Sequence, residues 1–310
     1  MFRTPRFVAL YSRRISLSLA ILAGMAYRSA ALRADEYRYF DSDGVRIRYI
    51  VEGEGEPVLL IHGFAVDLSW QWVLPGTVKA LAENYQVIAF DNRGHGLSGA
   101  PHEPDQYGVK MVEDAVRLLD HLKIERAHVV GYSMGALIAN KLLALHPERV
   151  ITATLGGAGW VRENDERGGF MKDLAESLDR GEGIGPLLVR LTPEGRPKPS
   201  GWRLKAINLV FRLFEDQKAL AATVRGMREF ALPEETLRAN RVPTLALIGE
   251  IDPLKVTVDE LAPVMGNLDV VVIDGASHLQ AFFRPEFKQS LGEFLSAHSH
   301  QPQRKKAADD

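Results

Sequence analysis

Short apolar runs alternate along the chain with longer segments of helical periodicity. The runs are too short for ordinary helices and are typical of strands buried in a parallel sheet. Residues 107–121 lie between two of these runs and repeat apolar side chains at the spacing of one buried helix face. The alternation predicts an α/β fold, a mostly parallel central sheet with helices on both faces. The predicted parallel strands are residues 58–61, 87–90, 127–130, 150–155, 244–248 and 270–273.

Two regions depart from this alternation. Residues 37–40 and 45–51 are rich in β-forming residues and flank a turn, so we expect a hairpin at one edge of the sheet. Residues 156–241 contain no strand pattern, and we expect a helical insertion that covers the carboxyl edge of the sheet as a cap. Its predicted helices are residues 166–180, 185–191, 201–214 and 216–230, with a loop at 193–199.

The first residues have the pattern of an export signal. Arginines and no acids precede residue 15, residues 15–27 are almost entirely apolar, and small residues follow up to Ala31. The apolar stretch is shorter than the roughly 20 residues that span a bilayer, which favours a signal peptide cleaved after Ala31 over a membrane anchor. Arg13-Arg14 also resembles a twin-arginine signal, although Ser16 departs from that pattern. We therefore expect a periplasmic or secreted protein, with membrane contact only through this segment if it stays uncleaved.

These patterns divide the chain into five parts. Residues 1–34 form the leader, and residues 299–310 form a polar tail that we expect to be disordered. The α/β core is predicted in two pieces, 35–158 and 239–298, and the cap is predicted between them at 159–238.

Composition excludes several classes of function. A chain of 310 residues that is 46% hydrophobic and 25% charged is long enough for one large domain with an insertion. Its formal net charge of −2, without a basic face, argues against a nucleic-acid partner. Cysteine is absent, which excludes a disulfide framework, a thiolate nucleophile and a cysteine-based metal site.

The most informative motif is Gly131-Tyr132-Ser133-Met134-Gly135. It follows the predicted strand 127–130 and precedes a helical pattern at 136–146. A serine at such a sharp strand-to-helix turn takes a strained backbone conformation that exposes its hydroxyl, and flanking glycines let strand and helix approach closely. We interpret the motif as a nucleophile elbow with Ser133 as the nucleophile.

A serine hydroxyl needs an adjacent base and an acid that orients the base. His278 follows the predicted strand 270–273, whereas His298 and His300 lie in the polar tail, so His278 is the predicted base. Asp252 follows the predicted strand 244–248 and precedes a proline; it is the predicted acid, with Glu250 and Asp274 as competitors. Asp252 would hold Nδ1 of His278 so that Nε2 faces Ser133.

An oxyanion hole is predicted beside the serine. His62-Gly63-Phe64 follows the strand 58–61, where the backbone N–H of Phe64 can face a bound carbonyl together with the N–H of Met134. We expect the side chain of His62 to brace the turn, because the backbone supplies the donors.

Taken in order, Ser133, Asp252 and His278 with the His62-Gly63-Phe64 loop resemble the α/β-hydrolase family over about residues 37–297. The segment 91–98 is similar to that family's Asp-x-Arg-Gly-His-Gly-x-Ser turn. The resemblance implies that this turn shapes the floor of the site and that His95 is structural. The family's haloalkane dehalogenases and epoxide hydrolases use a carboxylate nucleophile, so a serine implies an acyl-enzyme route that needs no metal or organic cofactor.

Substrate selection is expected from the cap. Trp160, Trp202 and Phe214 are the predicted substrate-binding residues, out of a wider set of apolar candidates that also includes Phe170, Phe211, Met227 and Phe230. We expect the basic residues Arg190, Arg196, Lys198, Arg203 and Lys205 to form a solvated face, although they could attract an acidic substrate.

The function predicted from these residues is hydrolysis of a small to medium, largely apolar ester or lactone. Two alternatives remain open. The same residues could serve a carbon–carbon bond hydrolase, a cofactor-free peroxidase or an acyltransferase. The chain could also be a non-catalytic, ligand-binding member of the fold. The sequence carries no pattern that predicts an oligomeric state.

Overall fold

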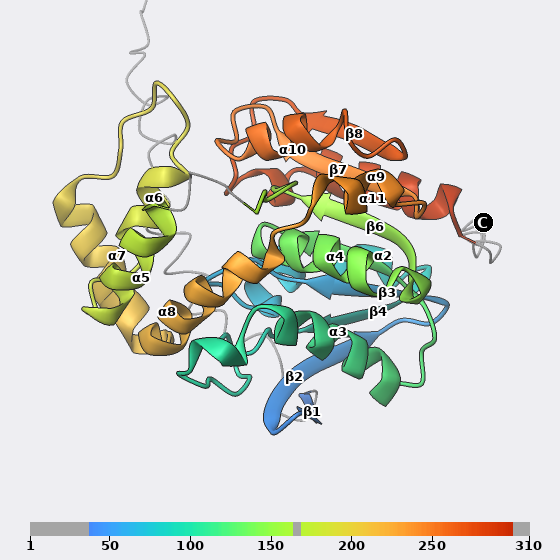
Figure 1. Ribbon diagram of the computed structural model, residues 1–310, viewed down its shortest axis with the longest axis horizontal. Helices are drawn as coiled ribbons and strands as arrows, with labels where there is room; N and C mark the ends of the chain where they lie inside the picture. The colour runs from blue at the N-terminus through green and yellow to red at the C-terminus, as the bar shows by residue number, and fades with distance from the viewer. Residues whose placement is uncertain (1–36, 164–168, 300–310) are drawn as a thin grey trace, which may run out of the picture.

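The computed structural model describes residues 37–163 and 169–299, and within them the strands form a single sheet (Figure 1). The strand order is β1-β2-β4-β3-β5-β6-β7-β8. β1 and β2 pair antiparallel as the predicted hairpin at one edge, and the strands from β4 to β8 pair parallel. The predicted leader at 1–34 and the tail beyond residue 299 lie outside the described residues.

Each predicted strand is confirmed within one or two residues at its ends. One expectation about burial is wrong, because the apolar run in β8 is not covered on both faces. Val270 and Val272 are 40% and 39% exposed, because they point to the opposite face of this last strand from Val271 and Ile273, which pack with α11. The strands are β1 Arg38–Ser42, β2 Val45–Glu52, β3 Glu56–Ile61, β4 Tyr85–Phe90, β5 Ala127–Tyr132, β6 Val150–Gly156, β7 Thr244–Gly249 and β8 Leu268–Ile273.

Helices cover both faces of the sheet, as predicted. α3 (Val109–His121) and α4 (Met134–Leu145) pack on one face, and α2 (Thr77–Leu81) and α11 (Pro285–Ala297) pack on the other. α10 (Lys255–Leu261) joins the α3 side through Leu261. In the ranges 37–163 and 169–299, no helix is both long and apolar enough to cross a membrane.

The predicted helical insertion is also present. Its helices are α5 Gly169–Asp179, α6 Gly185–Arg190, α7 Gly201–Phe214 and α8 Gln217–Gly226, followed by the 3-10 helix η6 (Met227–Phe230) and α9 Glu234–Ala239. Figure 1 shows α5 to α8 gathered at one end of the molecule, beyond the sheet. Leu174, Leu188 and Leu220 belong to an apolar core of the insertion itself. The insertion is therefore a packed layer of its own rather than a long loop.

Candidate active site

Ser133 occupies the turn between β5 and α4, with φ 55° and ψ −117°. This conformation is strained for any residue with a side chain. A Cβ on Gly131 would collide with the carbonyl oxygen of Gly135, and a Cβ on Gly135 would collide with that of Ile61. Both flanking glycines are thus required for β5, α4 and β3 to approach as closely as they do.

His278 and Asp252 form a hydrogen-bonded series with Ser133. Nε2 of His278 lies 3.0 Å from Oγ of Ser133, and Nδ1 lies 2.8 Å from Oδ2 of Asp252. The other carboxylate oxygen of Asp252 accepts the N–H of Leu254 at 2.8 Å. His278 and Asp252 are only 3% and 4% exposed. With an ionised Asp252, the ring proton sits on Nδ1 and Nε2 is left to accept the serine proton.

The two competing acids lie elsewhere. Glu250 is exposed, and its carboxylate accepts the N–H of Gly275 at 2.8 Å, which caps the turn after β8. Asp274 is exposed in the same turn. Asp252 is therefore the carboxylate that the fold presents to His278.

Tyr132, inside the elbow motif, contacts the loop that carries His278. Its hydroxyl donates to the backbone carbonyl of His278 at 2.5 Å, and its ring packs against the rings of His278 and Phe282 at 5.4 and 5.0 Å. Burial raises the pKa of this phenol well above its ordinary value, and the charge of Asp252 raises it further, so Tyr132 remains a donor. Sequence reasoning missed this residue, because nothing in the motif indicates where its side chain points.

The expected oxyanion loop lies directly against the serine. A Cβ added to Gly63 would be 3.3 Å from Cβ of Ser133, so a larger residue at this position would crowd the serine. Met134 is the first residue of α4, where the helix dipole is positive. Among the described residues, no acceptor is found for the N–H of Phe64 or of Met134. Both donors are consequently available to a bound oxygen.

The side chains of His62 and His95 stabilise the loop at residues 62–64. Nε2 of His62 accepts the N–H of Asn92 at 2.9 Å, and Nδ1 lies 2.7 Å from the carbonyl oxygen of Gly63. The ring of His95 packs edge-on against the rings of His62 and Phe64 at 5.4 and 5.5 Å. These contacts fix the backbone that carries the predicted oxyanion donor.

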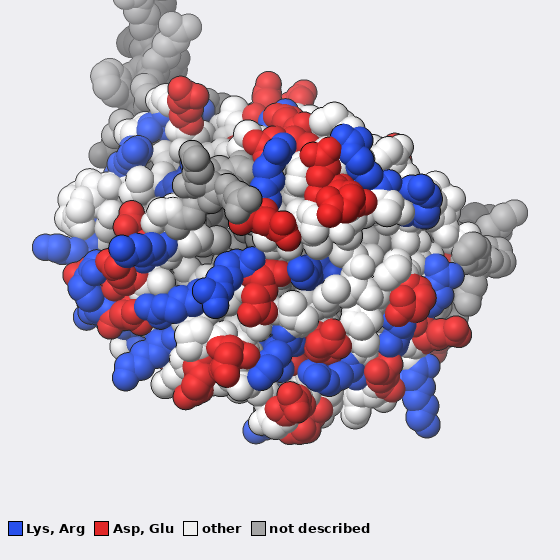
Figure 2. Space-filling model, viewed as in Figure 1, with Lys and Arg blue, Asp and Glu red and all other residues white. Residues whose placement is uncertain are grey.

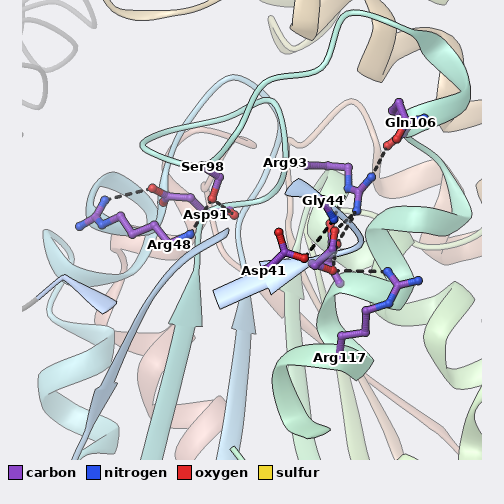
Figure 3. A network of polar contacts seen from close by, with 10 residues as sticks. Asp41, Gly44, Arg48, Asp91, Arg93, Ser98, Gln106 and Arg117 are labelled. Atoms are coloured by element: carbon purple, nitrogen blue, oxygen red, sulfur yellow. Dashed lines mark hydrogen bonds and ion pairs between the residues drawn. The ribbon is translucent and has the colours of Figure 1, made fainter. Parts of the chain in front are cut away.

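The turn at residues 91–98 connects this region to the rest of the core (Figure 3). Asp91 accepts from Arg48 at 3.1 Å and from the N–H of Leu68 at 2.9 Å. Arg93 donates to both carboxylate oxygens of Asp114 on α3, at 2.7 and 2.6 Å. The turn thereby ties β2 and the end of β4 to α3.

Two cavities meet at Ser133, and the helical insertion lines both. The smaller has a volume of about 130 Å³ and includes His278 in its wall. The larger, of about 600 Å³, includes Met134 instead. Apolar side chains dominate the smaller cavity, among them Trp70, Ile184, Leu188, Ile207, Phe211 and Phe282. The larger cavity combines an apolar wall with a charged one that holds Arg162, Lys172, Arg190, Arg225, Arg228, Glu163 and Glu176.

Comparison with known proteins decides the family. A family model described as alpha/beta hydrolase fold matches residues 56–182. The chain is also 34% identical over 223 residues to the putative carbamate hydrolase RutD of Azorhizobium caulinodans, which covers 66% of this chain and 77% of that one. The chain belongs to the α/β-hydrolase family.

Other relatives of this α/β-hydrolase differ in activity. It is 38% identical over 117 residues to Epoxide hydrolase A of Mycobacterium tuberculosis, which covers 36% of this chain and 35% of that one. The chain spans about a third or less of the length of the first curated relatives it matches. Among solved structures, the enol-lactonase of Burkholderia xenovorans LB400 superposes with a TM-score of 0.69 at 26% identity, covering 84% of this chain and all of that one.

The three predicted substrate contacts of this α/β-hydrolase lie away from both cavities at Ser133. Trp160 is 3% exposed, and its Nε1 donates to the carbonyl oxygen of Leu232, so it belongs to the core. Trp202 and Phe214 lie on α7 but are 70% and 40% exposed. None of the three lines either cavity. Of the wider set, Phe211 lines the smaller cavity, Phe170 and Met227 line the larger, and Phe230 is buried in the core.

The basic residues behave as expected with one exception. Arg196, Lys198, Arg203 and Lys205 are exposed, as a solvated face requires. Arg190 is half-buried and lines the larger cavity, because it ends α6 at the point where that helix meets the cavity wall.

Proposed function

We propose that this α/β-hydrolase cleaves a carboxylic ester or lactone through an acyl-enzyme formed on Ser133. The observation that carries the proposal is the hydrogen-bonded series Ser133–His278–Asp252, with the serine hydroxyl at the junction of two cavities. A nucleophile, a base and an orienting acid in this geometry are the components of acyl transfer by serine.

In the first step, Oγ of Ser133 attacks the substrate carbonyl and its proton passes to Nε2 of His278. Asp252 stabilises the imidazolium ion through Nδ1. The N–H groups of Phe64 and Met134 bind the oxyanion, and each such donor contributes about 3 kcal/mol to the transition state. His278 then protonates the leaving alcohol oxygen. Water, deprotonated by His278, attacks the acyl-enzyme. The bond between the acyl carbon and Oγ of Ser133 then breaks, His278 returns the proton to Oγ, and the acid leaves.

The residues that line the two cavities support a placement for each part of the substrate. The leaving oxygen must reach Nε2 of His278, which lines the smaller cavity. The smaller, apolar cavity would therefore hold the leaving alcohol. The larger cavity, next to Met134, would hold a small to medium acyl group, with the largely apolar part of that group against the apolar wall.

Lactones and carbamates are also candidate substrates. The similarity to an enol-lactonase over the whole of that chain supports a lactone, which reacts at the same type of carbonyl. The similarity to a putative carbamate hydrolase favours carbamates as a second candidate. Epoxides are poorer candidates, because epoxide opening in this family uses a carboxylate where this chain has Ser133.

A substrate panel tests the proposal. Chromogenic esters of graded acyl length, lactones and aryl carbamates are offered to the wild type and to Ser133→Ala. We expect turnover of at least one ester or lactone by the wild type and a loss of at least about 10⁴-fold in kcat for the variant. Equal rates for the two proteins would contradict the serine mechanism, and a fluorophosphonate adduct on another residue would contradict the assignment of Ser133.

We also propose that the N-terminal segment exports the protein. The basic, apolar and small residues up to Ala31 support this. The expected mature chain begins at residue 32, which N-terminal sequencing of the protein from the periplasm or the medium measures. Full-length protein confined to the cytosol would contradict export.

A further inference from the structure

Helix α7 presents two apolar faces instead of one. Ile207 and Phe211 are one turn apart, and they are buried to 6% and 2% exposure. Both line the smaller cavity, where they pack beside Leu188 of α6. Packing of this inner face into the apolar core of the insertion holds α7 in place.

The outer face of α7 is apolar as well. Trp202, Ala206, Leu209 and Leu213 are spaced by four, three and four residues, and at about 100° per residue they fall within about 60° of one another. All four are exposed, and Trp202, Leu209 and Leu213 keep 70%, 65% and 73% of their surface. These are the highest values for large apolar side chains among the described residues. A contiguous apolar stripe of this kind marks an interaction surface.

Cations border the stripe on both sides. On the helical wheel Arg203 lies on one flank, and Lys205 and Arg212 lie on the other. α7 contains no acidic residue between Gly201 and Phe214. In Figure 2 the left edge of the molecule, where Figure 1 places α7, carries blue basic side chains beside white and red ones. The outer face thus combines a tryptophan and two leucines with Arg203 and Lys205 on opposite flanks. Arg212 lies beside a surface hollow that also contains Asp179, Glu215 and Asp216.

We propose that this outer face of α7 docks on the surface of a lipid bilayer that contains anionic headgroups. Amphipathic helices that lie in the interface bury Trp and Leu at the boundary between headgroups and acyl chains. Their Arg and Lys side chains reach back to the phosphates. A second copy of the chain fits less well, because pairing two α7 helices would bring together two sets of cations from helices that contain no acid of their own.

Docking would place the catalytic region next to the membrane. The inner face of α7 lines the cavity that also contains His278, so only the width of one helix separates bilayer from cavity. The docking itself does not depend on hydrolysis. It also adds a membrane contact beyond the N-terminal segment.

Vesicle binding tests the surface. The full chain carrying Ser133→Ala, which prevents lipid hydrolysis, is sedimented with vesicles of phosphatidylcholine alone or mixed with phosphatidylglycerol. We expect Leu209→Glu with Leu213→Glu to weaken binding to the mixed vesicles at least tenfold, and each of Arg203→Gln, Lys205→Gln and Arg212→Gln to weaken it about fivefold. The control is Leu145→Glu, which changes an exposed leucine of α4, 45% exposed, and is expected to have no effect.

A local probe separates α7 from the N-terminal segment, which can bind lipid independently. Trp202 is the most exposed of the four tryptophans, so brominated lipids should quench its emission when α7 docks. The quenched component is expected to vanish in Trp202→Phe. Absence of such quenching on vesicles that bind the protein would overturn the proposal. So would a lipid-free dimer, seen by analytical ultracentrifugation, that Leu209→Glu with Leu213→Glu abolishes while vesicle binding is unchanged.

Hydrolysis provides a separate readout. The double Leu209 and Leu213 variant, made without the Ser133 change, is expected to retain wild-type turnover of a short water-soluble ester, since neither leucine lines a cavity. Retained vesicle binding with no esterase activity would overturn the proposed function and leave the docking surface standing. The reverse result would overturn docking alone.

Discussion

The carboxyl edge of the sheet and the helical insertion are held together by different forces. At the edge, the ion pairs Arg48–Asp91 and Arg93–Asp114 are completely buried, and each carboxylate also accepts further hydrogen bonds. In the insertion, ion pairs such as Arg225–Asp179 are more than two-fifths exposed, and apolar packing supplies the cohesion. Buried networks fix one geometry, whereas apolar walls tolerate substitution. A rigid edge suits the proposed roles of Ser133, Asp252 and His278, and a more tolerant insertion suits the proposed selection of substrate.

The largest expected effect is on the edge, at the proposed orienting acid. Asp252→Asn keeps the shape of the side chain but donates where the carboxylate accepted, so His278 takes the wrong tautomer. We expect kcat to fall about 10⁴-fold with little change in KM, measured on the best ester of the panel. The matched control is Glu250→Gln, in the turn next to it, with a change of less than about threefold. A fall of similar size in Glu250→Gln would show that the assignment of the acid is wrong.

The second prediction compares ion pairs from the two regions. Asp114→Ala leaves Arg93 buried without its carboxylate, which costs about 3–5 kcal/mol in the free energy of unfolding. Asp179→Ala removes the exposed partner of Arg225 and should cost less than about 1 kcal/mol. Urea unfolding followed by circular dichroism measures both. Equal losses in the free energy of unfolding would mean that ion pairs stabilise the insertion as much as they stabilise the edge.

The same contrast explains what could be predicted from the sequence. Ser133, Asp252 and His278 each follow a strand, and the register between parallel strands brings their ends to one edge. Their proximity therefore followed from chain order and motif. The roles of these residues remain predictions until activity is measured.

The insertion could not be predicted to the same depth. Both faces of α7 are apolar, so periodicity predicts the helix but cannot tell which face turns inward. The sequence pattern favours Trp202 and Phe214 as pocket residues, whereas in the structure Ile207 and Phe211 line the smaller cavity. The size of an aromatic side chain on α7 therefore does not indicate whether that side chain lines the cavity. Only the packing against α6 and α8 orients the helix.

The third prediction concerns selectivity at this inner face. Phe211→Leu enlarges the smaller cavity, and we expect the ratio of kcat/KM for a bulky over a small leaving alcohol to rise about tenfold. Phe214→Leu, on the same helix but outside both cavities, should leave the ratio unchanged. If the ratio instead changes with acyl length, the two cavities have been assigned to the wrong halves of the substrate.

The smallest expected effect returns to the edge. Tyr132→Phe removes the hydroxyl that donates to the carbonyl of His278 but keeps the ring, so it should cost about 1 kcal/mol of stability and lower kcat a few-fold. Tyr107 is a matched control, because its hydroxyl also donates to a backbone carbonyl, that of Pro101, at 2.5 Å. Tyr107→Phe should lose similar stability with kcat unchanged. If Tyr132 positions His278, kcat must fall in Tyr132→Phe and stay unchanged in Tyr107→Phe. If both variants keep wild-type kcat, the bond to His278 stabilises the fold alone; a fall as large as that of Asp252→Asn would instead place the phenol in the reaction.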